Sequence, residues 1–281
     1  MDKKIKRVHY FHADASALGG KIEAPFCQLL PVQAPVSLPP VGGYATVRAD
    51  RFQQEGLISF DAAYTQVAGS SLDKDGPWST LVTSVIEGFN VLNAFTADRI
   101  VAQIATEHPR EGYDPKVTFV GTTFENVRIG GYPVEIVLDL DICKQGNAEE
   151  YPSQPCIRDE RFLARVAEQR RRMTDERCIP QWCTDKSIPN WVRERYQWDN
   201  SDTRSGKDGV LCTIVKEIRG YFPGRLFGNV FEIPEFGKGF LGELLVDASS
   251  FRLIMARFEL GCGVSGAAGG GSANIEGRTN P

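Results

Sequence analysis

Hydrophobic and polar residues alternate most regularly in "YPVEIVLDLDIC", residues 132–143. A period of two residues places successive side chains on opposite faces of a β-strand. We therefore predict a strand over residues 133–142 with one buried and one solvated face. The apolar face would hold Val134, Ile136, Leu138, Leu140 and Ile142, and the polar face Glu135, Asp139 and Asp141.

Helical spacing replaces this alternation in "IRDERFLARVAEQRRRMTDER", residues 157–177. Phe162, Leu163, Val166 and Met173 would share one helical face, and charged residues fill the others. A shorter helical pattern follows in "IPNWVRERYQWDN". We take residues 144–208 as a helical insertion, because β-type patterns and turn-forming glycines occupy residues 44–143 and 209–262. The prediction is a mainly β fold, either a sandwich or repeat-like stacked hairpins, with an α-helical insertion.

Both ends of the chain differ from this β-body. Residues 1–43 contain five prolines and predict an extended arm that lies on the β-surface of its own chain or of a neighbour. Both forms of docking stay open. Residues 263–281, "GVSGAAGGGSANIEGRTNP", are rich in glycine, alanine and serine and predict a flexible tail.

An internal echo links "FQQEGLISFDAAYTQVA", residues 52–68, to "FNVLNAFTADRIVAQIA", residues 89–105. A weaker third copy, "FENVRIGGYPVEIV", starts at Phe124. Periods of 20 to 50 residues are typical of repeated supersecondary units. A true duplication and a set of similar hairpins both explain the echo, and both predict a β-body. The identical pairs are Phe52/Phe89, Asp61/Asp98, Gln66/Gln103 and Ala68/Ala105.

The region from "WSTLVTSVIEGFNVLNAFTADRIVAQI" to "VTFVGTTFENVRIGGYPV" resembles a group of bacterial β-rich proteins that includes the exported "choice-of-anchor P" type. The shared features are a "TAD-x-[VI]-x-A" step and a following "G-x-T-x-F" segment. The resemblance implies a β-rich surface or structural module and brings no catalytic residues. The exported group carries a signal peptide, which we do not find at this N-terminus.

Composition argues against two classes of partner, nucleic acids and membranes. With 281 residues, a net charge of −4 and 42% hydrophobic residues, the chain has no global basic field that would attract nucleic acid. No apolar stretch reaches the 18 residues of a membrane span. We therefore expect a cytoplasmic protein without membrane insertion, and leaderless release stays open.

The common catalytic and nucleotide-binding motifs are missing from the sequence, and we predict no catalytic, cofactor-binding or metal site. The seven cysteines are scattered, which favours free thiols over a disulfide framework. The alternative is a zinc site built from Cys143, Cys156, Cys178 and Cys183, but the tight paired spacing of structural zinc sites is lacking.

Other candidate residues each have a simpler explanation. His9 and His12 would face opposite sides of a strand, which leaves only His12 and Asp14 together. We expect His108, before Pro109, to be an exposed turn residue. Glu135, Asp139 and Asp141 fit the wet face of a strand, and Arg170–Arg172 fit a salt-bridged helix because residues 144–208 hold 13 basic and 12 acidic residues.

These observations predict a non-enzymatic β-rich protein that assembles with copies of itself as a filament, shell or surface component. Aromatic and arginine side chains are typical interface residues, and here they also fit anchors of the insertion on its own β-body. The alternative function is an enzyme or small-ligand-binding protein with a pocket between the β-body and the insertion. The predicted interface residues are Phe26, Leu30, Trp191, Arg195 and Trp198.

Overall fold

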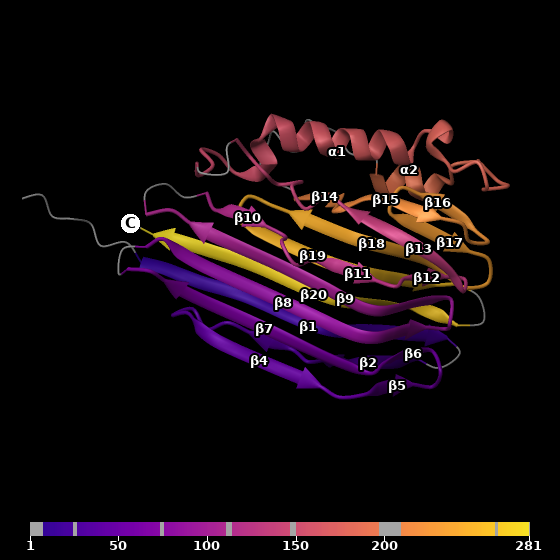
Figure 1. Ribbon diagram of the computed structural model, residues 1–281, viewed down its shortest axis with the longest axis horizontal. Coiled ribbons are helices and arrows are strands. Elements are labelled where there is room, and N and C mark those ends of the chain that lie inside the picture. The colour runs from indigo at the N-terminus through magenta and orange to yellow at the C-terminus, as the bar shows by residue number, and fades with distance from the viewer. Residues whose placement is uncertain are drawn as a thin grey trace, which may run out of the picture.

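Two antiparallel β-sheets lie face to face in the computed structural model, and helices run along one edge (Figure 1). The structure describes residues 8–24, 27–73, 76–110, 114–146, 150–196, 209–261 and 264–280. Strands β1, β19 and β20 of one sheet pack against β7, β8 and β9 of the other, with the main hydrophobic core between them. The predicted mainly β fold with a helical insertion is confirmed.

The first sheet, called sheet A, contains both ends of the described chain. Its main path is β16 (Arg225–Phe227), β17 (Val230–Ile233), β18 (Gly237–Val246), β19 (Ser250–Leu260), β20 (Ser265–Asn280), β1 (Val8–Ala24) and β2 (Gln28–Gln33). Two short strands extend it, β14 (Val210–Thr213) on β18 and β3 (Val36–Ser37) on β1.

The second sheet, called sheet B, is built mainly from the middle of the chain. Its main path is β15 (Val215–Gly220), β13 (Tyr132–Leu138), β12 (Arg128–Ile129), β9 (Phe95–His108), β8 (Trp78–Val91), β6 (Ile58–Phe60) and β5 (Phe52–Gln54). Four further strands complete it: β7 (Ala62–Ser71) beside β8, β4 (Gly43–Ala49) beside β7, and β10 (Lys116–Thr118) and β11 (Thr123–Glu125) beside β9.

The strand predicted over residues 133–142 is shorter than expected. β13 ends at Leu138, and the chain then turns into the insertion. Its partner strand changes sheets at Ile214: the N–H of this residue donates to Gly242 of sheet A, and its carbonyl accepts from Asp139 at 2.7 Å. A strand that crosses between sheets here leaves no straight partner for a longer β13.

Sheet B contains three hairpin turns at almost equal spacing, at residues 55–56, 92–93 and 130–131. Two-residue turns of the type common in hairpins need positive φ at both central residues. All six central residues meet this condition, with φ of 45° at Glu55, 71° at Gly56, 53° at Leu92, 52° at Asn93, 60° at Gly130 and 84° at Gly131. The sequence echo therefore marks three turns that share positive φ, although the loops differ in length: Gln54 pairs with Ile58 and Val91 with Phe95 across three residues, and Ile129 with Tyr132 across two. Both explanations of the echo predicted a β-body, which the structure has.

The predicted arm over residues 1–43 is wrong, because its first half is a central strand. β1 lies between β20 and β2 and pairs with β20 over most of its length (Figure 1). Its 17 residues contain no proline, whereas Pro31 lies in β2, where one side of the strand has no partner in the described part of sheet A. Apolar residues of this segment suggested docking on a β-surface. Leu29 and Val32 among them are exposed and Phe26 lies outside the described residues, but the other five are buried in the chain's own core: Phe11, Ile22, Leu30, Val36 and Leu38.

The predicted flexible tail over residues 263–281 is also wrong. Residues 265–280 form β20, which lies between β1 and β19. Small residues suit this position because large side chains of the opposite sheet already fill the space. A Cβ atom at Gly270 would lie 3.2 Å from side-chain atoms of Ile86 and Phe89.

The insertion predicted over residues 144–208 contains the helices of the described structure. α1 (Glu160–Met173) begins at Asp159, whose side chain accepts a hydrogen bond from the N–H of Phe162 at 2.8 Å. The buried face of α1 presents Phe162 and Val166 to the main core and closes one edge of the sandwich. The other helical pieces are η1 (Cys156–Arg158), η2 (Glu176–Cys178) and α2 (Asn190–Tyr196).

A second, smaller apolar cluster joins α2 and the end of α1 to sheet A. Val192 of α2 is fully buried there with Phe227 and Phe240 of sheet A. The insertion therefore covers part of sheet A from outside and leaves a groove beside it, which forms the candidate site.

Candidate ligand-binding groove

A groove with a volume of about 1050 Å³ lies where the insertion meets β16, β17 and the start of β18. We call it the aromatic groove. Ligand sites of proteins have similar volumes and combine apolar walls with a few fixed polar groups. The insertion contributes Trp182, Thr184 and Asp185, and the remaining walls include Tyr221, Phe222, Arg225, Glu232, Lys238 and Glu259.

The apolar wall is a chain of aromatic rings in edge-to-face contact. Trp182 lies 4.8 Å from Phe222 and 5.6 Å from Tyr221, between ring centroids. Beyond the groove lining, Tyr221 also meets Tyr132 at 5.3 Å and an interplanar angle of 88°. Tyr221 and Tyr132 are 50% and 45% exposed, whereas Phe222 is buried and anchors the row in the core. The groove thus offers exposed aromatic surface on a fixed base.

Arg225 holds two carboxylates of the groove in place. Its Nη1 donates to Asp185 at 2.8 Å, and its Nε donates to Glu232 at 2.8 Å. The guanidinium also lies over the Phe227 ring, 5.4 Å from the ring centroid. Hydrogen bonds from Ser187, and then the charge of Arg225, hold the pKa of Asp185 below its ordinary value. This carboxylate is therefore ionised at neutral pH and cannot act as a general acid there.

Lys238 forms the second charged group of the wall. Its ammonium lies 3.7 Å from Glu259 and 4.2 Å from the centroid of the Trp191 ring. Glu259 also accepts a hydrogen bond from Arg257 at 2.6 Å. Four acidic and two basic side chains line the groove, so an anionic ligand would be disfavoured.

The residues predicted as an interface serve different purposes. Leu30 is 1% exposed, so its prediction as an interface residue is wrong: β2 turns this side chain into the core. Trp191 packs on Phe227 and Phe240, and Arg195 donates to Glu243, which is 5% exposed. These two residues anchor α2 on its own sheet, which was the alternative explanation. Phe26 and Trp198 lie outside the described residues.

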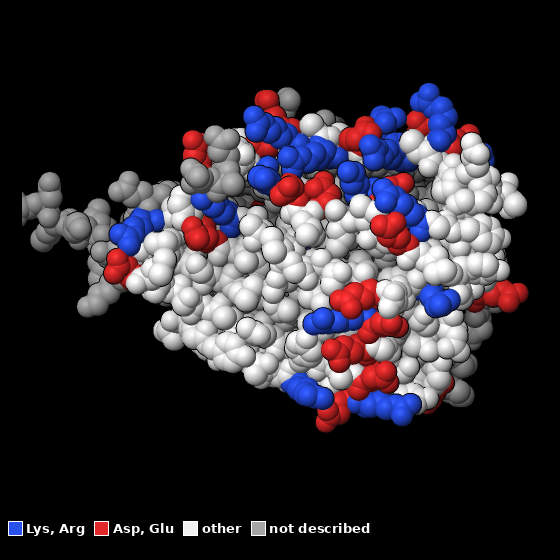
Figure 2. Space-filling view, viewed as in Figure 1, with Lys and Arg blue, Asp and Glu red and all other residues white. Residues whose placement is uncertain are grey.

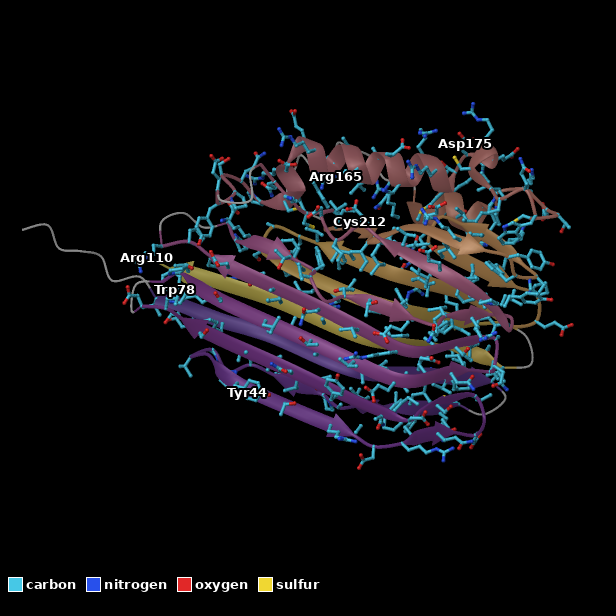
Figure 3. The ribbon with its side chains drawn as sticks, in the orientation of Figure 1. Tyr44, Trp78, Arg110, Arg165, Asp175 and Cys212 are labelled. Carbon is cyan, nitrogen blue, oxygen red and sulfur yellow. The ribbon has the colours of Figure 1, made fainter. Side chains whose placement is uncertain are left out.

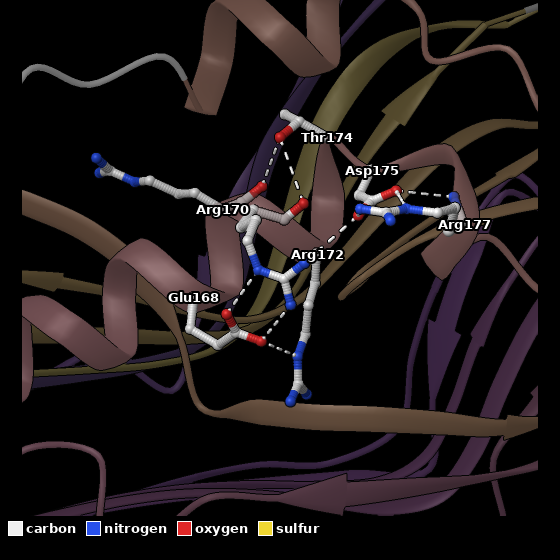
Figure 4. Close-up of polar contacts among 7 residues, drawn as sticks. Glu168, Arg170, Arg172, Thr174, Asp175 and Arg177 are labelled. Carbon is white, nitrogen blue, oxygen red and sulfur yellow. Dashed lines mark hydrogen bonds and ion pairs between the residues drawn. The ribbon is translucent and has the colours of Figure 1, made fainter.

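Two arginines of the basic run, Arg171 and Arg172, are paired within α1 (Figure 4), whereas Arg170 donates to the carbonyl of Leu211 on β14. Glu168 accepts hydrogen bonds from Arg171 and Arg172, each at 2.8 Å. Asp175 accepts in the same way from Arg177. Blue and red groups accordingly alternate over the helical edge of the molecule (Figure 2). The prediction of a salt-bridged helix is therefore confirmed for Arg171 and Arg172.

The cysteines separate into different environments. Cys143 and Cys156 are in contact and buried near Cys212 beneath α1, where Figure 3 labels Cys212. Cys183 belongs to the smaller apolar cluster, and Cys178 is exposed. The four proposed zinc ligands therefore do not meet, and the described residues contain no group of three metal-ligating side chains that could hold an ion. The six cysteines that the structure describes are free thiols.

The predictions for the histidines and for the strand carboxylates are confirmed only in part. His9 and His12 do face opposite sides of β1. The prediction of an exposed His108 is wrong, because this residue is 2% exposed at the end of β9 and points between the sheets. Glu135 forms an ion pair with Arg219 at 3.5 Å on the surface, as expected of a wet face.

Sequence reasoning offered a pocket between the β-body and the insertion as an alternative, but it did not find the residues that line the aromatic groove. Its residues come from segments up to 79 positions apart, Trp182 to Gly261, and no spacing pattern connects them. The one local signal was "YFPGR", residues 221–225, in which two aromatic residues and an arginine flank a turn.

The fold and the groove define a two-sheet antiparallel β-sandwich with a helical insertion and an open groove between the two. The chain belongs to the family described as "Domain of unknown function (DUF8256)", whose family profile matches residues 9–247. Comparisons with curated proteins and with solved structures gave no match. Of the helices in the described ranges, none combines the length and the apolar character that a membrane span requires.

Proposed function

We propose that the protein is a non-catalytic binding protein whose aromatic groove takes a neutral, hydroxyl-rich ligand such as an oligosaccharide. The observation that carries this proposal is the exposed ring of Tyr221, packed on the half-buried Trp182, beside carboxylates fixed by ion pairs. Rings of Tyr and Trp offer an apolar face with a polar edge. The C–H faces of a sugar ring can lie on such rings while its hydroxyl groups bond to carboxylate and guanidinium groups.

Three of the four carboxylates in the groove, all but Glu235, favour a neutral ligand over a cation because they already have cationic partners. Asp185 and Glu232 are both paired with Arg225, and Glu259 is paired with Lys238 and Arg257. A cationic ligand would have to compete with these internal partners. Hydroxyl groups need only the free lone pairs and N–H groups that the ion pairs leave, so they can bind without breaking them.

Binding is favoured over hydrolysis. Glycoside hydrolysis uses one carboxylic acid with a raised pKa beside a carboxylate. Here Asp185 has a lowered pKa, and it shares Arg225 with Glu232. An ionised Asp185 lacks the proton that a general acid must donate, so this carboxylate favours binding over hydrolysis.

The test is binding of a panel of neutral oligosaccharides, first by array and then by titration calorimetry. Tyr221→Ala removes an exposed ring without opening the core and should weaken binding at least 10-fold. Tyr44→Ala is the matched control, because this tyrosine is 63% exposed on β4, away from the groove (Figure 3). Failure of every neutral oligosaccharide to bind, or equal binding by both variants, would refute the proposal. Binding of basic peptides instead would favour a cationic ligand.

Self-assembly remains a second candidate function, now through a strand edge. β2 ends the main path of sheet A and exposes Leu29 at 73% and Val32 at 55%. An edge strand with apolar side chains is a ready site for pairing with another copy. Light scattering after size-exclusion chromatography should show an oligomer that Leu29→Lys/Val32→Lys dissociates. A wild-type monomer at high concentration would refute it.

A further inference from the structure

Two histidines from different sheets meet inside the sandwich at the end where the described chain begins and finishes. The ring centroids of His9, near the start of β1, and His108, at the end of β9, are 4.5 Å apart. His9 stacks on Trp78 at 5.2 Å and meets the edge of Phe11 at 4.6 Å. The two histidines are 7% and 2% exposed. Trp78 and Arg110 mark this end in Figure 3.

Each ring has one bonded and one unbonded nitrogen. Nδ1 of His9 lies 2.9 Å from Oγ1 of Thr279 on β20, and His108 bonds to the backbone of Gly277 on the same strand. His9 Nε2 and His108 Nδ1 are buried without a protein partner, as are the hydroxyl groups of Thr80 and Thr106. Thr80 and Thr106 face each other on β8 and β9, next to Trp78 and His108. This end of the core is thus polar and incompletely bonded.

We propose that His9 and His108 form an acid-sensitive lock, which holds this end of the sandwich closed near neutral pH and opens it when both rings take up protons. The geometry supports the lock because its members join three segments, the start of β1, the end of β20 and the β8–β9 pair. Two imidazolium rings at this separation would repel each other, and neither could reach bulk water without the strands parting.

Among the residues that the structure describes, neighbouring charges do not relieve that repulsion. Glu107 on β9 accepts a hydrogen bond from Tyr151, and Glu276 on β20 pairs with His12 and Arg278, all on outer faces. Arg110 donates to Asp73 and to the carbonyl of Gly76. On β1, Tyr10 is exposed and Asp14 accepts from Asn274 at 3.0 Å. Within the described ranges, the titratable group that faces each buried imidazole across the core is therefore the other histidine.

The direction of the pH effect follows from burial. Burial first, and then the charge of His108, lower the pKa of His9 from 6.5 to about 3; burial lowers that of His108 to about 4, against the opposing hydrogen bond to Gly277. Lowered values mean that the closed form is fully stable above the ordinary pKa and loses stability as the pH falls below about 6.5. At pH 5, protonation of each histidine in the open form shifts the equilibrium between the closed and open forms toward the open form by about 30-fold. Protonation of both shifts it by up to about 10³-fold.

Hydrogen exchange of the full chain, corrected for the intrinsic rate, tests the lock. Between pH 7.5 and pH 5, protection at the start of β1 and the end of β20 should fall by about 10²- to 10³-fold. Protection of the β12–β13 hairpin at the opposite end should change less than about 10-fold. His9→Gln and His108→Gln should each remove about 30-fold of the pH dependence, and the double variant nearly all of it. His12→Gln, on the outer face of β1, is the control and should keep the full dependence.

A fall in protection that is equal at both ends, or one that persists in the double variant, would overturn the proposal. Because the variants could fail to fold, the wild-type protein provides a second measurement. The chain has three histidines, so its ring resonances are easily followed by NMR. At least two should remain neutral in the folded protein at pH 5.5; titration of all three near pH 6.5 would equally overturn the lock.

Discussion

Introducing an aspartate at two adjacent positions of β20 tests whether this glycine-rich segment is a core strand. Ala268 is 2% exposed and lies between Gly20 of β1 and Phe258 of β19, whereas Ala267 is exposed on the other face. Ala268→Asp would place a carboxylate among apolar side chains. Such burial costs several kcal/mol, and the larger side chain adds about 1–3 kcal/mol of overpacking. We expect a total loss of at least about 4 kcal/mol.

Ala267→Asp should change the free energy of unfolding by less than about 1 kcal/mol, because the new carboxylate stays in water. Urea denaturation followed by circular dichroism measures both variants. With a slope of about 3 kcal/mol per molar urea, Ala268→Asp should lower the midpoint by about 1.3 M, and Ala267→Asp by less than about 0.3 M. Equal, small effects would mean that residues 265–280 do not form the strand, and the assignment of sheet A would have to be abandoned.

Three further predictions concern other parts of the molecule. Glu243→Ala should reduce the free energy of unfolding by about 3–5 kcal/mol, because Arg195 and Arg257 lose a carboxylate that is 5% exposed. Glu243→Gln should cost less, and equal urea midpoints for the wild type and both variants would contradict this. Ellman's reagent should modify Cys27 and Cys178 in the native protein but not Cys143 or Cys212, whose thiol pKa values are raised by burial. Peptide mapping that finds all four cysteines modified at one rate would show this prediction to be wrong. Gly270→Val should lower the melting temperature by several degrees, since its side chain would press on Ile86 and Phe89, and an unchanged melting temperature would argue against the close sheet packing.

Local sequence patterns predicted the helices and strands that keep one face buried along their whole length. The helical spacing of Phe162 and Val166 predicted α1, and alternation predicted β13, because one face of each is buried throughout. β20 escaped prediction because its burial depends on large residues elsewhere: Gly270 is small since Phe89 fills the space opposite. Composition alone cannot distinguish such a strand from a flexible segment.

The site was harder to predict than the fold. Histidine before proline suggested an exposed turn, but His108 is the last residue of a long strand whose inner face continues to the end of the sandwich. The aromatic groove depends on the packing of Trp182 against Tyr221, which no local rule connects. What the sequence did indicate was the place, a pocket between the β-body and the insertion.

The pairing of β1 with β20 has a consequence for how the chain folds during synthesis. Val8 pairs with Asn280, so the first strand must wait for residues made some 270 positions later. Contacts of such separation form slowly, since a long loop must close before they contribute. Sheet B, made from the middle of the chain, can pair earlier, but its inner face stays uncovered until β20 arrives. On the ribosome, the nascent chain would therefore expose apolar strands until β20 has been made, and we expect it to depend on chaperones until sheet A closes.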